Sequence, residues 1–293
     1  MKNSPELLKT NNFMWRTARL LDQHRFAYLF ADGDAEAVRE ALLPYQNPDG
    51  GFGHGLEADI RGPLSQPMPT WMALIILDEI NALRGDDRIV ARACDYLLTI
   101  TDSEGGVPFV LPSAMDYPHA PWWEVEGGPV PASLNPTACI AALLHKNQIE
   151  HPWLAPATEF CWRKLDELEE SSPYEMRAIL PFLDFVADRQ RAEKVFAHIG
   201  PKILEQKMVA LKPTTEEDTH SPLDYASRPE SLARRLFSDE VIQENLDALE
   251  AAQQEDGGWP ISWFAWNQAS VLEARGAVTI NALAALRAYG RID

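Results

Sequence analysis

The feature that most constrains the fold is a short motif that recurs near the two ends of the chain. Residues 46–52 and residues 253–259 both read Gln-x-x-Asp-Gly-Gly followed by an aromatic side chain. Residues 102–107 form a weaker copy about 55 positions after the first, and the last copy lies about 150 positions further on, close to three periods of roughly 50. A repeat of this length indicates that one supersecondary unit is stacked several times. We expect two intervening copies to have diverged beyond recognition.

The motif itself predicts a tight turn between two helices. Its glycine pair can adopt positive φ, its aspartate can accept hydrogen bonds from nearby amides, and its aromatic ring can pack back on the preceding helix. We therefore interpret the motif as a structural element and look elsewhere for a site of chemistry.

Apolar residues follow a helical spacing on both sides of the two strong copies. Residues 38–43 and 241–252, which precede the turns, have one apolar face, whereas residues 71–77 and 277–286, which follow them, are apolar on most faces. An outer and an inner ring of helices require this pairing, because an inner helix is covered on nearly every side.

Strand signals are scarce, and the β-rich run at residues 107–110 is interrupted by proline. No stretch has the composition of a linker between domains. The pattern therefore predicts an all-α fold, an α/α toroid of about five or six helix pairs, formed by residues 1–293 as a single domain.

The repeat also carries a resemblance to known proteins. The spacing Gln-x-x-x-Gly-x-aromatic is met by Gln46, Gly50 and Phe52, and again by Gln253, Gly257 and Trp259. It resembles the repeat of squalene-hopene cyclases, oxidosqualene cyclases and related protein prenyltransferase subunits. The resemblance implies an α/α toroid over most of the chain. For activity it implies acid chemistry on a hydrophobic, isoprenoid small molecule, as in the terpenoid-cyclase superfamily.

The motifs with which those families carry out their standard reactions are missing. Class II cyclases use the middle Asp of Asp-x-Asp-Asp as the acid, and the nearest approach is residues 215–219, in which Glu217 would stand at that position. Class I cyclases need Asp-Asp-x-x-Asp, and residues 86–90 lack the last carboxylate. No cysteine has the Asp-x-Cys context of the prenyltransferase zinc site, and phosphate-binding, dinucleotide and nucleophile-elbow motifs are also missing. We predict no cofactor and no metal.

The charge of the chain disfavours some partners. A formal net charge of -18 repels polyanions, so we exclude nucleic acid and regard anionic membrane surfaces as poor partners. The first residues do not resemble a secretory signal and no stretch looks apolar enough to span a bilayer, so we expect a soluble, cytoplasmic protein without integral membrane association. Cys94, Cys139 and Cys161 are expected to be reduced core thiols. A small-molecule ligand is expected, and the oligomeric state is left open.

Four segments that lead into helices are longer than a turn requires, and such loops commonly carry function. They are residues 54–69, 108–136, 212–229 and 260–276. In a ring of helix pairs, the segments that enter inner helices lie at the same end. We therefore expect the four loops to meet at one mouth of the toroid.

Carboxylates, imidazoles and indoles are concentrated in these four loops. Such a set could protonate a substrate and shelter a cation, or it could stack a sugar ring between two carboxylates. As catalytic residues we predict Glu57, Asp59, Glu124, Asp218 and His220. As substrate-binding residues we predict His54, His119, Trp122, Trp123, Tyr225, Trp263 and Trp266.

The same residues have structural interpretations. Glu57 and Asp59 could cap the helix expected near Thr70 or pair with Arg61, and the two adjacent tryptophans could wedge a proline-rich loop onto the rim. The loop histidines could bind a metal, but they lack the tight spacing of a metal site. The acidic run 216–218 is typical of a solvated patch.

Three functional hypotheses remain open at this point. The first is a terpenoid-cyclase-like protein that acts by acid chemistry on an isoprenoid, with Glu57 and Asp59 as acid or base. The second is a carbohydrate-active enzyme, since helical toroids also support glycosidases and lyases. The third is a non-catalytic binding module.

Overall fold

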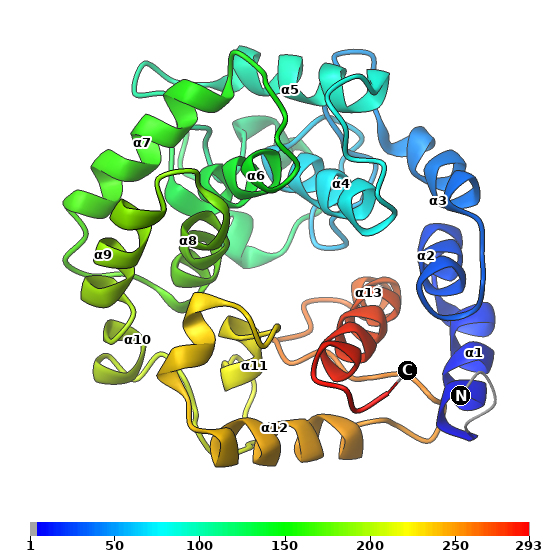
Figure 1. Ribbon diagram of the computed structural model, residues 1–293. Coiled ribbons are helices and arrows are strands. Elements are labelled where there is room, and N and C mark those ends of the chain that lie inside the picture. Colours follow the sequence, from blue (N-terminus) through cyan, green and yellow to red (C-terminus); the bar gives the residue numbers. More distant parts are fainter. Residues whose placement is uncertain (1–4, 293) are drawn as a thin grey trace. The chain divides into compact units, whose positions relative to one another are not determined.

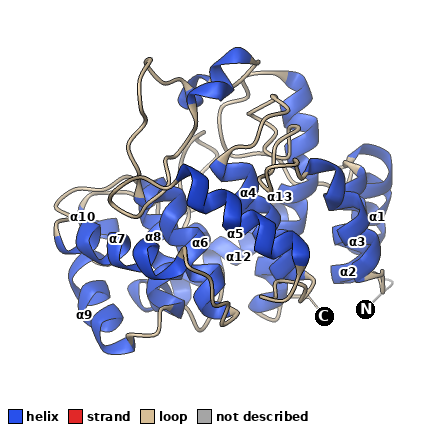
Figure 2. Cartoon of the chain, turned by 90° about the horizontal axis from the view of Figure 1, so that it is seen from above, coloured by secondary structure: helices blue, strands red, loops and turns tan. Residues whose placement is uncertain are grey.

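The computed structural model describes the backbone of residues 5–292. Helices and loops make up this part of the chain, and its extended pairings are isolated β-bridges (Figure 2). The all-helical class predicted from the sequence is confirmed, as expected for an α/α toroid.

The chain divides into two compact units. The smaller combines Met1–Ala41 with Gly200–Asp293, and the larger is Leu42–Ile199. The single domain expected over residues 1–293 stays a prediction.

The larger unit is a series of helices of similar length. They are α4 (Pro67–Glu79), α5 (Arg88–Ile100), α6 (Leu134–Lys146), α7 (Leu154–Asp166), α8 (Pro173–Phe185) and α9 (Arg189–Ile199), with 3-10 turns at Leu43–Tyr45, Pro112–Asp116 and Pro121–Trp123. α6 lies between α4 and α8 and also packs on α7 (Figure 1). Ala138, Ala141 and Ala142 of α6 are fully buried, and their small side chains let the neighbouring helices approach closely.

All three cysteines are free and buried in the larger unit. Burial raises the pKa of Cys94 and of Cys139 to about 12 each, and it raises the pKa of Cys161 as well. These thiols therefore stay protonated near neutral pH, which agrees with the prediction of unreactive core cysteines.

The smaller unit joins both ends of the chain. Its helices are α1 (Pro5–Thr17), α2 (Leu20–Phe30), α10 (Lys202–Glu205), α11 (Pro222–Tyr225), α12 (Asp239–Ala251) and α13 (Gln268–Ala288), while α3 (Ala35–Leu42) ends at the boundary and Leu232–Leu236 is a 3-10 turn. α13 packs on α1, α2 and α12. Gly276 of α13 permits this approach, because an added Cβ would lie 2.9 Å from that of Ala18. Nearby, the fully buried Asp22 is neutralised by ion pairs with Arg19 and Arg25, as a buried carboxylate requires.

By length and composition alone, α13 is apolar enough to cross a bilayer, which corrects the expectation that no stretch qualifies. The expectation failed because a stretch can be apolar enough on average to span a bilayer although it contains a few charged residues. In the structure α13 contacts the other helices of its unit, and 39% of its most apolar stretch is buried.

Three of the long loops are shorter than the sequence indicated, and the second ends at Ser133 because α6 begins at Leu134. α4 begins at Pro67, where proline suits the first turn of a helix, so that its loop ends at Gln66. α13 begins at Gln268 because Asn267 caps it, accepting the amide hydrogen of Ser270 at 2.9 Å. Residues 268–276, which we expect from the sequence to be part of a loop, therefore belong to α13.

The three copies of the repeat form the same turn. The first glycine has φ of 96° in Gly50, 97° in Gly105 and 96° in Gly257, as the motif predicted. One backbone hydrogen bond closes each turn: Asn47 N–H to Gly51 O at 2.8 Å, Asp102 N–H to Gly106 O at 3.0 Å, and Gln254 N–H to Gly258 O at 2.9 Å.

A buried threonine on the following helix completes each turn. The hydroxyl oxygen accepts the amide hydrogen of the motif's last residue: Phe52 to Thr70 at 3.1 Å, Val107 to Thr137 at 3.0 Å, and Trp259 to Thr279 at 3.0 Å. The three threonines are fully buried. This partner lies well outside the seven-residue motif, so the repeat extends into the helix that follows it.

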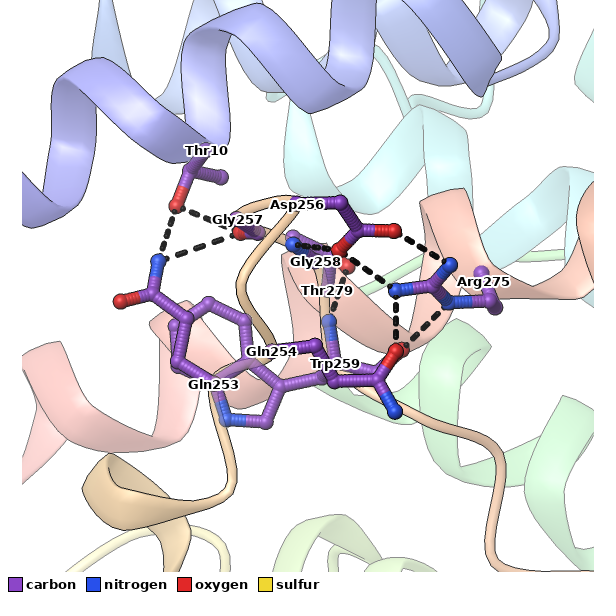
Figure 3. Close-up of polar contacts among 9 residues, drawn as sticks. All are labelled: Thr10, Gln253, Gln254, Asp256, Gly257, Gly258, Trp259, Arg275 and Thr279. Atoms are coloured by element: carbon purple, nitrogen blue, oxygen red, sulfur yellow. Dashed lines mark hydrogen bonds and ion pairs between the residues drawn. The ribbon is translucent and has the colours of Figure 1, made fainter.

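Each turn is also seated against the backbone of a neighbouring helix. A Cβ added to the first glycine would lie 2.2 Å from the carbonyl oxygen of Arg92 on α5, 2.7 Å from that of Pro156 on α7, and 2.3 Å from that of Lys9 on α1. The first two copies therefore pack on the second helix that follows the turn, α5 for the first copy and α7 for the second. The last copy packs on the first helix of the chain, and Figure 3 shows Thr10 of α1 donating to Gly257 O.

Candidate functional site

In the larger unit, the first two long loops pair through their backbones. Arg61 N–H donates to Pro118 O at 3.0 Å, and Ala120 N–H donates to Asp59 O at 2.9 Å, on either side of a bridge between Ile60 and His119. In this antiparallel pattern the bridged residues are a non-hydrogen-bonded pair, whose side chains lie close together. The pairing therefore joins two loops that together carry seven of the predicted site residues.

Gln66 holds this pair of loops to the start of α4. Its side chain is almost completely buried, and its amide group donates to Ser113 Oγ at 3.0 Å and accepts the Leu111 N–H at 2.8 Å. Sequence reasoning missed Gln66, because no motif contains it. The one available signal was its position directly before Pro67, since proline is favoured in the first turn of a helix, although the helix was expected only near Thr70.

Glu57 and Asp59 lie in the first loop in different surroundings. Asp59 is buried, with 6% of its surface exposed. A carboxylate oxygen of Glu57 accepts the Asp59 N–H at 3.2 Å, which fixes the backbone that carries Asp59. Of the two carboxyl groups, Asp59 is the one withdrawn from water and Glu57 the one that orients it.

His119 and Glu124 form an ion pair in the second loop. His119 Nδ1 lies 2.6 Å from the Tyr117 carbonyl oxygen and Nε2 lies 3.0 Å from Glu124 Oε2. Both neighbours are acceptors, so this arrangement favours hydrogen on both ring nitrogens, the imidazolium form. The hydrogen bond to Glu124 raises the pKa of His119, in agreement with this protonation state.

The adjacent tryptophans of the second loop differ in exposure. Trp122 is exposed over 41% of its surface, whereas Trp123 is buried and stacks on Phe109 with ring centroids 4.5 Å apart. The indole N–H of Trp123 is buried without a hydrogen-bond partner among the described residues. Trp123 therefore anchors the loop, as the structural interpretation proposed, and Trp122 presents an aromatic face to solvent.

His54 lies at the beginning of the first loop in a left-handed conformation with φ of 58°. Its Nε2 lies 2.9 Å from Asn47 Oδ1, so the exposed ring contacts the first repeat turn. This contact favours a structural role for His54 at the base of the loop.

In the smaller unit, the other predicted residues lie in two further loops, except Tyr225, which ends the short helix α11. His220 is buried, and its ring packs edge-on against Tyr225, whose hydroxyl donates to Met208 O at 2.8 Å. Asp218 is exposed, and its N–H donates to Ser262 O at 2.8 Å, which places it beside the loop that carries Trp263 and Trp266. The proposed meeting of all four loops at one mouth joins both units and stays a prediction.

Two open surface depressions lie away from all predicted site residues. One of about 540 Å³ lies between α7 and α9, and one of about 770 Å³ lies between α6 and α7. Arg191 borders both, with its guanidinium 4.5 Å above the ring of Trp162 and an ion pair to Asp166. Residues of α6, α7 and α9 line most of both, and residues 149–152 between α6 and α7 border the larger one, so a search of the four long loops could not find them. Among the described residues no group of three or more His, Cys, Asp or Glu side chains is arranged to hold a metal ion.

Comparison with known proteins finds similarity at the level of three-dimensional structure. No protein-family profile and no curated protein matches the chain. Two structures of the type II terpene cyclase MstE from Scytonema, variants in complex with geranylgeranyl dihydroxybenzoate as substrate, are similar to it with TM-scores of 0.49. They are 14% and 15% identical, over 96% of this chain and 87% of the cyclase chain. At such low identity no activity transfers from them.

Proposed function

We propose that this protein is an enzyme that acts by acid chemistry on a hydrophobic, isoprenoid-type small molecule, with Asp59 as the proton donor. The observation that carries the proposal is the pairing of the first two long loops. The pairing joins the loop that carries the buried Asp59 to the loop that carries the His119–Glu124 ion pair and the two tryptophans.

Each part has a role in such chemistry. A carboxyl group shielded from water can deliver a proton to an alkene or epoxide without competition from solvent. The faces of aromatic rings such as Trp122 stabilise the carbocation that forms. Glu57 orients Asp59 through the backbone, and the ion pair of His119 with Glu124 holds the second loop in place.

The first experiment is native mass spectrometry of the freshly purified protein, with extraction of whatever copurifies. A bound isoprenoid or other neutral lipid supports the proposal. A bound sugar contradicts it and favours the carbohydrate-active alternative, in which Trp122 would stack on the ring.

The role of Asp59 as proton donor is tested by measuring turnover of a polyprenyl aromatic such as geranylgeranyl dihydroxybenzoate, followed by product analysis. Asp59→Asn should lower the rate by about 100-fold or more, because it removes the general acid. Glu57→Gln keeps an oxygen that can accept the Asp59 N–H and should lower the rate less. Asp116→Asn is the matched control, since Asp116 is an exposed carboxylate of the second loop. Equal rates for Asp59→Asn and Asp116→Asn would remove Asp59 from the mechanism.

A further inference from the structure

An aromatic loop, residues 261–266, precedes α13 in the smaller unit. Phe264 is exposed over 53% of its surface, and Leu272 near the start of α13 is exposed over 45%. Trp263 and Trp266 are partly exposed in the same loop. Single exposed apolar side chains are ordinary, but Trp263, Phe264 and Trp266 lie within four positions and form a small apolar patch, a feature that marks interaction sites.

The patch is uncharged in a strongly charged protein. Residues 257–272 contain no Asp, Glu, Lys or Arg. Because 24% of the chain is charged, a stretch of this length would ordinarily carry about four such residues. Indole and phenyl rings in a segment that itself carries no charge are typical of segments that enter the interfacial layer of a membrane.

The neighbouring loop determines which headgroups suit this patch. The hydrogen bond from Asp218 N–H to Ser262 O places the exposed acidic run 216–218 beside the aromatic loop. Carboxylates attract the ammonium groups of choline and ethanolamine headgroups, and indole faces also bind quaternary ammonium. The same carboxylates repel phosphatidylglycerol and other anionic lipids.

From this complementarity we infer that the aromatic loop docks the protein peripherally on a phospholipid bilayer whose headgroups carry ammonium groups. Phe264 enters the layer, Trp263 and Trp266 lie at headgroup level, and the acidic run contacts the ammonium groups. The inference is independent of the chemistry proposed for Asp59, which lies in the other unit, so either can fail without the other.

The test is flotation of the full-length protein with phosphatidylcholine vesicles and with phosphatidylglycerol vesicles at low salt. Wild-type protein should float with phosphatidylcholine and bind phosphatidylglycerol more weakly. Phe264→Asp should lower the partition coefficient by about tenfold or more, because a charge replaces the ring that enters the bilayer. Leu98→Asp is the matched control, since Leu98 is 42% exposed on α5 and should have no effect.

The role of the acidic run is tested by the double substitution Glu216→Lys and Glu217→Lys, which should weaken binding to phosphatidylcholine and narrow the difference between the two kinds of vesicle. Failure of the wild type to bind phosphatidylcholine, or equal loss in Phe264→Asp and Leu98→Asp, would overturn the inference. So would a dimer in light scattering that Phe264→Asp dissociates, because the patch would then be covered by a second copy of the chain.

Discussion

The first and last repeat turns share their backbone geometry, but their aspartates contact different side chains. Asp49 accepts the Ser65 hydroxyl at 2.7 Å, whereas Asp256 forms an ion pair with Arg275 at 2.8 Å. Arg275 also donates to Gln254 (Figure 3). Its guanidinium lies 4.6 Å from the Phe13 ring centroid, so it connects the last turn to α1. The glycine and the threonine partner are common to both turns. The comparison shows that the conformation of the turn is the constant feature, and that the partner of the aspartate is free to vary.

The largest effect is expected from the first glycine of each turn. Gly50→Ala and Gly257→Ala should each lower the free energy of unfolding by at least about 2 kcal/mol, since the backbone is left-handed and the new Cβ would meet the backbone of another helix. Urea denaturation followed by circular dichroism measures this loss.

Matched controls for the glycines separate strain from collision. Gly55 and Gly290 both have φ of 71° with nothing within 4 Å of an added Cβ. Their alanine variants should lose only about 1 kcal/mol. If Gly257→Ala lowers the free energy of unfolding no more than Gly290→Ala does, then the last turn does not pack closely on α1. In that case it differs from the first turn in its packing.

A smaller effect is expected from the buried threonines. Thr70→Val and Thr279→Val should each cost about 1–3 kcal/mol, because the amide of Phe52 or Trp259 loses its partner away from water. Thr→Ser at either position keeps the hydroxyl and should retain most of the stability. Different losses at Thr70 and Thr279, measured by the same urea titration, would show that the turns are not equivalent.

The smallest effect is expected from the partners of the aspartates, where the two turns should differ. Asp256→Asn should cost about 0.5 kcal/mol at neutral pH and low salt, because the ion pair with Arg275 is half exposed. Asp49→Asn breaks no ion pair, so 1 M salt should reduce the loss for Asp256→Asn and leave that for Asp49→Asn unchanged. Thermal unfolding in both salts checks this, and equal salt dependence would contradict it.

The pH dependence of the Asp256 contribution follows from its pKa, which the hydrogen bond from Arg275 lowers below the ordinary 3.8. A carboxyl group with a lowered pKa in the folded state stabilises the protein above its unfolded pKa and loses that contribution as the pH falls through the folded value. The difference between wild type and Asp256→Asn should therefore be full above about pH 5 and vanish in acid. A difference that persists in acid would assign it to hydrogen bonding alone.

Much of the fold could be predicted because the motif fixes local backbone conformation. A glycine pair after an amphipathic helix predicted the turn, and the apolar helix after it predicted an all-α chain. Helix starts were predicted less well, since Asn267 and Pro67 act through capping geometry that a hydrophobic pattern does not contain.

The candidate site could be predicted as an inventory but not as an arrangement. Loop length and composition pointed to Asp59, His119 and Trp122. They did not indicate that residues 59–61 pair with residues 118–120, or that Gln66 ties both loops to α4. Those facts depend on backbone pairing between segments roughly 60 residues apart, for which a single sequence contains no signal.

By itself the sequence determined the turns, the helices and the chemical inventory of the loops, because these depend on backbone preferences and side-chain types within a few residues. Only the tertiary structure decided that the last turn packs on α1, that Asp59 is withdrawn from water and that Phe264 is exposed. Whether a residue is buried, and which side chains it contacts, depends on the distant segments that pack around it. Identical motifs can therefore give Asp49 a hydroxyl partner and Asp256 a guanidinium.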